Sequence, residues 1–145
     1  MADGARLRVY SIASTMGNSN SYIIAIDFDG TCVEHEYPHI GMDVEGAVDT
    51  LRALTSKGHR LILYTMRSGS KLEAAQRWFK ERKIELWRSN ENPEQREWTE
   101  SPKVFADYYI DDSALGCPIK FIEGVRRPVV DWAKVRTILE YDKVL

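Results

Sequence analysis

The sequence is poor in cysteine and lacks the spacings by which cysteine and histidine bind zinc. Its two cysteines, Cys32 and Cys117, are far apart and form no CxxC motif, which argues against a disulfide framework and against a zinc site. No apolar stretch approaches the roughly 20 residues that cross a bilayer, and the first residues lack the apolar core of a signal peptide. We therefore expect a soluble, cytoplasmic protein with free thiols and no membrane partner.

The sequence also lacks a strong charge of either sign, because 20 Lys and Arg residues stand against 22 Asp and Glu residues, a net charge of −2. There is no overall basic field to hold a polyanion, so composition leaves nucleic acid open as a partner without supporting it. A length of 145 residues with 43% apolar content fits one domain with its own core. We place this domain at residues 21–145 and interpret residues 1–20 as a tail or an extra edge strand.

Strand and helix patterns alternate along the domain. Short continuous apolar runs are typical of parallel strands covered on both faces, and they predict strands at residues 23–26, 61–64, 84–87 and 106–110, with a weaker one at 119–122. Helical spacing of apolar residues fills the intervals, except for residues 88–102, which we expect to form a surface loop. The alternation predicts an α/β fold built on a doubly wound parallel sheet.

The expected helices begin at polar residues that commonly cap helices. Asp43 precedes the first, Ser70 with Glu73 matches a capping box for the second, and Asp131 precedes the last. Gly58 stands where the first helix is expected to end.

Acidic residues follow two of the expected strands. The first strand breaks into Asp27-Phe28-Asp29-Gly30-Thr31, and a later strand ends in Asp111-Asp112. Because a strand repeats every two residues, Asp27 and Asp29 point the same way. Ligands of open α/β sheets bind at the carboxyl ends of the strands, so we expect these acids to converge there with Thr65, which ends the second strand.

Carboxylates gathered in one pocket repel one another and any phosphate unless positive charge neutralises them. Mg²⁺ suits oxygen ligands, and Lys103 can supply an ammonium group. With the charge balanced, Asp27 can attack phosphorus and form an aspartyl-phosphate that water hydrolyses, while Asp29 carries the proton.

Residues outside the acidic motifs are also candidates for the site. The hydroxyl of Thr65, the main-chain amides after it, including that of Met66, and Lys103 are expected to hold the phosphoryl oxygens. Arg67 is a candidate for a substrate phosphate, the alternative being an exposed loop arginine. His35 and His39, in a short flap after the first motif, either contact a leaving group or face water.

In this order the motifs resemble those of the haloacid dehalogenase superfamily of phosphotransferases, over roughly residues 22–125. The matching segments are Asp27-Phe28-Asp29-Gly30-Thr31, Leu61-Ile62-Leu63-Tyr64-Thr65, Lys103, and Tyr109-Ile110-Asp111-Asp112. The resemblance, to small capless members found in bacteria and phages, implies a Rossmann-like core without a large cap. It also implies Mg²⁺ bound by Asp27, the main-chain carbonyl of Asp29, and Asp111, with Asp112 either beside Lys103 or capping the next segment.

We therefore predict a Mg²⁺-dependent phosphomonoesterase. An open site would admit a small phosphorylated molecule, an accessible phosphate on a macromolecule, or the surface of another subunit in an oligomer. Two alternatives remain. One is a receiver-like domain that accepts phosphate for signalling, although receivers carry the phosphorylated Asp on the third strand, which here ends in Trp87-Arg88-Ser89-Asn90. The other is a metal-binding interaction module without turnover.

Overall fold

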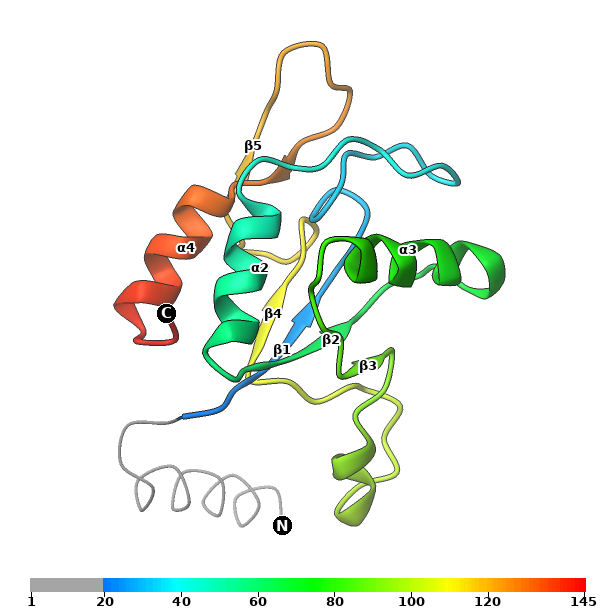
Figure 1. Ribbon diagram of the computed structural model, residues 1–145, viewed down its shortest axis with the longest axis vertical. Helices are drawn as coiled ribbons and strands as arrows, with labels where there is room; N and C mark the ends of the chain where they lie inside the picture. Colours follow the sequence, from blue (N-terminus) through cyan, green and yellow to red (C-terminus); the bar gives the residue numbers. More distant parts are fainter. Residues whose placement is uncertain (1–19) are drawn as a thin grey trace.

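A four-stranded parallel sheet forms the centre of the protein, as a computed structural model of residues 20–145 shows (Figure 1). Its strands are β1 (Ile23–Ile26), β2 (Arg60–Leu63), β3 (Arg88–Ser89) and β4 (Tyr108–Ile110), in the order β3-β2-β1-β4. The predicted α/β fold with a parallel sheet is confirmed. Because the chain order reverses beside β1, the carboxyl ends of β1 and β4 border the position where open sheets bind ligands.

Three helices cover one face of this sheet. They are α2 (Ala47–Ser56), α3 (Gly69–Glu81) and α4 (Trp132–Tyr141), and α2 lies beside α4 (Figure 1). Their buried side chains form one apolar cluster with Ile24 and Leu61 of the sheet. None of these helices has the length and apolar character needed to span a membrane.

The second face is covered by the connection between β3 and β4. Here Ile23, Ala25 and Ile62 pack against Val104 and Ala106 in a separate apolar cluster. The connection contains a short 3-10 helix, η1 (Pro93–Glu97). Within residues 20–145, helices therefore cover one face and this connection covers the other.

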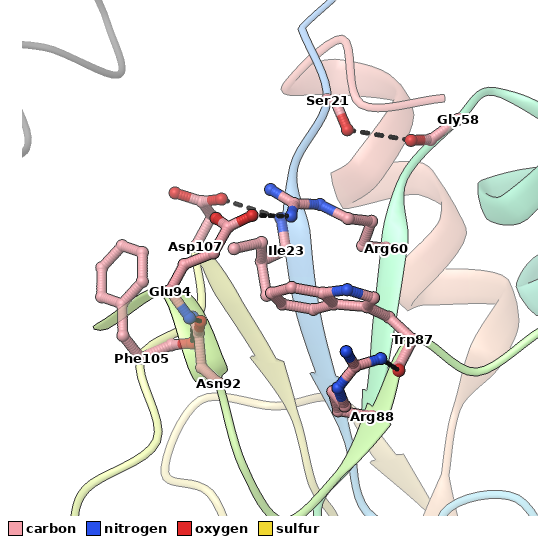
Figure 2. A network of polar contacts seen from close by, with 10 residues as sticks. All are labelled: Ser21, Ile23, Gly58, Arg60, Trp87, Arg88, Asn92, Glu94, Phe105 and Asp107. Carbon is pink, nitrogen blue, oxygen red and sulfur yellow. Dashed lines mark hydrogen bonds and ion pairs between the residues drawn. The ribbon is translucent and has the colours of Figure 1, made fainter. Parts of the chain in front are cut away.

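Polar contacts hold the connection in place (Figure 2). Asn92 Nδ2 donates to the carbonyl of Phe105 at 3.0 Å, which closes the segment on itself. At its end, the carboxylate of Asp107 accepts from the amide of Ile23 at 2.8 Å.

A tryptophan between two arginines completes this face of the sheet. The guanidinium carbon of Arg60 lies 4.3 Å from the ring centroid of Trp87, and that of Arg88 lies 5.7 Å from it. Figure 2 shows the ring between the two side chains. Arg60 also pairs with Glu94 of η1 at 2.6 Å, so the stack and the connection support each other.

Two strand predictions are wrong. The third strand lies at Arg88–Ser89 instead of 84–87, because the amide of Ile84 donates to the carbonyl of Phe79 and closes the turn after α3. The fifth strand, β5 (Ile119–Lys120), pairs antiparallel with β6 (Val129–Val130) in a separate two-stranded sheet. The predicted loop at residues 88–102 contains β3 and η1.

The first helix does not begin at Asp43. It begins at Ala47, after Gly46, which has a left-handed backbone with φ 84°. Asp43 instead accepts a hydrogen bond from Trp78 Nε1 at 2.8 Å and pairs with Arg82 at 2.8 Å. The carboxylate therefore joins α3 to the segment before α2.

The other helix boundaries agree in part with the sequence. Asp131 caps α4 as predicted, accepting from the amide of Lys134 at 3.2 Å. Gly58 follows the end of α2 with φ 88°, as predicted. The predicted capping box at Ser70 is wrong, because α3 starts at Gly69, before Ser70. The prediction for residues 1–20 lies outside the described residues, Asn20 apart.

Candidate active site

Three carboxylates meet at the carboxyl edge of the sheet. Asp27 follows β1 and Asp111 follows β4, and the amide of Asp27 donates to the carbonyl of Ile110 at 3.0 Å. One carboxylate oxygen from each of Asp27, Asp111 and Asp112 lies within 4.8 Å of the others. We call these three residues the acidic cluster. The structure thus brings together two acids separated by most of the chain, and adds Asp112 to them.

Thr31 joins two members of the cluster. Its Oγ1 donates to Asp27 Oδ2 at 2.8 Å and accepts from the amide of Asp112 at 3.2 Å. Its own carbonyl accepts from the buried Nε1 of Trp132 at 2.7 Å, which fixes the residue to the start of α4. Sequence reasoning gave Thr31 no role, although its place in the first motif was a usable signal.

His35, which the sequence left either to contact a leaving group or to face water, contacts Asp112. Its Nε2 lies 2.9 Å from Asp112 Oδ2, with side chains 13% and 9% exposed. Gly30 makes room for this contact, because a Cβ at that position would overlap both His35 Nε2 and the Asp112 carboxylate. No spacing in the sequence announces this pair, since residues 35 and 112 come from separate loops.

Within residues 20–145, no Lys or Arg forms an ion pair with the acidic cluster, and His35 contacts its member Asp112. The pKa of Asp27 is raised from its ordinary value near 3.8 to about 8, chiefly by burial and also by Asp112 and Asp111, against the hydrogen bond from Thr31. Burial also raises the pKa of Asp111, although the amide of Ser113 opposes this. The positions of three clustered carboxylates fit a hard divalent cation such as Mg²⁺, which prefers oxygen ligands.

Asp29 stands apart from the cluster and belongs to an ion pair. Arg67 Nε donates to Asp29 Oδ2 at 2.8 Å and Nη2 donates to Oδ1 at 2.7 Å, a bidentate contact. The Arg67 side chain is 1% exposed and that of Asp29 is 18% exposed. Arg67 is therefore not the exposed loop arginine that was one of the sequence-based alternatives.

Thr65 lies two residues beyond the end of β2, at the carboxyl edge of the sheet, where the amide of Tyr64 donates to the carbonyl of Ile26 at 2.8 Å. Its Oγ1 accepts from the amide of Arg67 at 3.1 Å, and its amide donates to Asn90 Oδ1 at 2.8 Å. The side chain of Met66 is 98% exposed. The turn after β2 is thus held by its own polar groups, with Met66 outermost.

The structure does not bring Lys103 to the acidic cluster. Lys103 is exposed, and its carbonyl accepts from Gln95 at 2.9 Å. Within residues 20–145, Lys103 forms no ion pair, and the expected contact between Asp112 and Lys103 is replaced by the contact of Asp112 with His35.

Comparison with protein-family models and with curated proteins finds no match. A solved structure does match, that of a conserved protein from Bacteroides thetaiotaomicron, with 36% sequence identity and a TM-score of 0.70. The match covers 85% of this chain and 93% of the Bacteroides chain. The two proteins belong to one family. The Bacteroides protein is described as conserved, with no activity named, so membership in its family supports the fold and leaves the chemistry to be argued from the site.

Proposed function

We propose that the protein is a Mg²⁺-dependent phosphomonoesterase of the haloacid dehalogenase type, with Asp27 as its nucleophile. The observation that carries this proposal is the convergence of Asp27, Asp111 and Asp112 within 4.8 Å at the carboxyl edge of β1 and β4. Open α/β sheets bind ligands where their strand order reverses, and this cluster follows the two strands on either side of that point.

Asp27, Asp111 and Asp112 would hold the cation, together with the main-chain carbonyl of Asp29 that the superfamily uses. Three acids at this distance favour a cation because burial, together with the neighbouring Asp112 and Asp111, raises the pKa of Asp27 to about 8 without one. When bound, Mg²⁺ would neutralise this charge and polarise a phosphoryl oxygen.

Asp27 would form a bond from its free carboxylate oxygen to phosphorus while the bond from phosphorus to the leaving oxygen breaks. Thr31 orients this carboxylate by its hydrogen bond to Oδ2, which leaves Oδ1 for attack. Water would then attack the aspartyl-phosphate, break the bond from phosphorus to the Asp27 oxygen, and release inorganic phosphate.

Asp29 would carry the proton in both half-reactions. It lies two residues beyond the nucleophile and outside the acidic cluster, as a proton carrier must. In the first half-reaction it would protonate the leaving oxygen, and in the second it would take a proton from the attacking water.

The turn after β2 would hold the phosphoryl group. The Thr65 hydroxyl and the amide of Met66 would do this, because the pairing of β1 with β2 brings this turn to the same carboxyl edge of the sheet as Asp27. Lys103 is exposed and has no ionic partner within residues 20–145, so we assign it a supporting part only, in which its ammonium approaches bound phosphate.

The fold is compatible with a capless, doubly wound core of this superfamily. The connection between β3 and β4 would take the place of the second helical layer. Residues 27–46 and 64–68, where a cap domain would be inserted, contain no helix or longer strand. Met66 and Leu115, both fully exposed beside the ends of β2 and β4, leave the site accessible to a phosphate on a macromolecule as well as to a small molecule.

Hydrolysis of p-nitrophenyl phosphate tests the proposal. We expect turnover that depends on Mg²⁺, stops in EDTA and is lost in Asp27→Asn. The control is Asp49→Asn, which removes an exposed acid from α2 and should leave turnover unchanged. Turnover by Asp27→Asn at the wild-type rate would refute Asp27 as the nucleophile.

A metal-binding module without turnover is the second candidate, because the acidic cluster by itself would account for binding of a cation. This candidate would be selected if calorimetry shows Mg²⁺ binding and the protein hydrolyses none of a broad panel of phosphate esters.

A further inference from the structure

The Arg67 side chain is buried, and its guanidinium is hydrogen-bonded within the protein. Besides its two bonds to Asp29, Nη1 donates to the carbonyl of Pro38 at 3.2 Å and Nη2 to that of His39 at 2.8 Å. The guanidinium carbon also lies 5.1 Å from the ring centroid of Phe28. Every nitrogen of the guanidinium is thus occupied, and with 1% exposure the side chain cannot reach a substrate without breaking four hydrogen bonds.

Arg67 and its hydrogen-bond partners join three parts of the chain. Asp29 belongs to the turn after β1, Pro38 and His39 belong to the flap, and Arg67 itself follows β2. Tyr37, also in the flap, has its ring centroid 5.2 Å from the guanidinium carbon. A bidentate contact fixes both the position and the plane of a carboxylate, which a single bond does not.

The contact with Arg67 distinguishes Asp29 from the other three aspartates of the site. Three of them form the acidic cluster, in which Asp112 contacts His35, and Asp29 alone is paired with an arginine. An acid two residues from Asp27 would otherwise point the same way and be free to join the cluster. Arg67 therefore separates the acid that is needed for proton transfer from the acids that are needed for binding a cation.

We propose that Arg67 is a positioning residue that keeps the Asp29 carboxylate out of the acidic cluster and in the orientation for proton transfer. This inference rests on the proposed phosphatase function. It replaces the sequence-based assignment of Arg67 to the substrate phosphate, because the guanidinium is already used inside the protein.

Leaving-group dependence tests this role. Protonation of the leaving oxygen matters more for phenyl phosphate than for p-nitrophenyl phosphate, because p-nitrophenolate leaves without a proton. In Arg67→Met we expect kcat/KM to fall by about 100-fold more for phenyl phosphate, the size of a typical general-acid contribution. Asp29→Asn should show the same preference, and the double variant should show no further change. Arg67→Lys, which keeps the charge without the bidentate contact, should fall between Arg67→Met and the wild type.

If the role of Arg67 were purely structural, Arg67→Met would lower kcat/KM by the same factor for the two substrates. That result, or additive losses in the double variant, would overturn the proposal. The control is Arg136→Met, which breaks an exposed pair with Glu140 on α4 and should change neither rate.

A stability measurement separates this inference from the proposed function. In EDTA, urea denaturation of the two single variants and the double variant gives the coupling between Arg67 and Asp29 without any turnover. We expect Arg67→Met to raise the unfolding equilibrium constant by about 100-fold, and much less when Asp29 is already Asn. If the two residues are coupled but the wild type hydrolyses no ester, the proposed phosphatase function is refuted and the stabilising contact between Arg67 and Asp29 stands. If they are not coupled, the contact does not position Asp29 and the inference is refuted.

Discussion

Replacing Asp27 with Asn should stabilise the metal-free protein, although it removes the proposed nucleophile. The pKa of Asp27 rises from about 3.8 to about 8 on folding, chiefly because of burial. Below pH 4 both the folded and the unfolded states hold the proton, so Asp27 costs nothing. As the pH rises toward 8 the unfolded chain loses the proton first, which lowers the free energy of unfolding until the folded state also ionises.

The magnitude follows from the difference between the two pKa values. At about 1.4 kcal/mol for each pKa unit, the cost above pH 8 is at most about 6 kcal/mol. Part of this cost comes from Asp111 and Asp112, which remain in the variant and still repel each other. We therefore expect Asp27→Asn to raise the free energy of unfolding by about 2 kcal/mol. For a domain of this size that is a rise in Tm of roughly 5 to 10 °C.

Thermal melts from pH 4 to pH 8.5 in EDTA measure the effect. The difference in Tm between Asp27→Asn and the wild type should be near zero at pH 4 and should grow toward pH 8. Adding MgCl₂ should stabilise wild type and reduce the difference, because a ligand that binds only the folded state raises its stability. Glu123→Gln is the control, since Glu123 is exposed and should show no such pH dependence. A variant that is less stable than wild type at pH 8, or a difference that does not change with pH, would refute the reasoning.

Two other substitutions test the packing around the site and the sheet. Gly30→Ala should lower the free energy of unfolding by about 1 to 3 kcal/mol and abolish stabilisation by Mg²⁺, because φ is 82° and the new Cβ overlaps His35 Nε2. Gly124→Ala is its control in the same melts, with a similar φ of 79° and open space around the added Cβ. His59→Ala should cost about 2 kcal/mol in urea denaturation, because it leaves two main-chain groups, bonded to the ring at 3.0 and 2.7 Å, without partners. An unchanged urea midpoint would show that water replaces the ring.

The convergence of Asp27 and Asp111 could be predicted because it needs only local information. Each acid directly follows an apolar run, and parallel strands bring their carboxyl ends to one edge whatever lies between them. The role of Asp131 as a helix cap was predictable for the same reason, since its bond reaches only three residues along the chain.

Other features depend on distances that the sequence does not contain. Arg67 reaches Asp29 because two turns approach within a few ångströms after the sheet has formed, and any of several arginines could have done so. The capping pattern at Ser70 failed because Gly69 before it has a positive φ of 54° and already belongs to α3. The strand expected at residues 84–87 failed because an apolar run serves equally well to close a helix against the core, as Ile84 does.

The phosphorylation of Asp27 itself tests the account most directly. The protein can be mixed with p-nitrophenyl phosphate and Mg²⁺, quenched in acid within milliseconds, and digested for mass spectrometry. The account predicts a burst of one p-nitrophenolate for each protein molecule and a phosphoryl group on the peptide that contains Asp27. Turnover with no phosphoryl group on that peptide, or with the group on another residue, would contradict it.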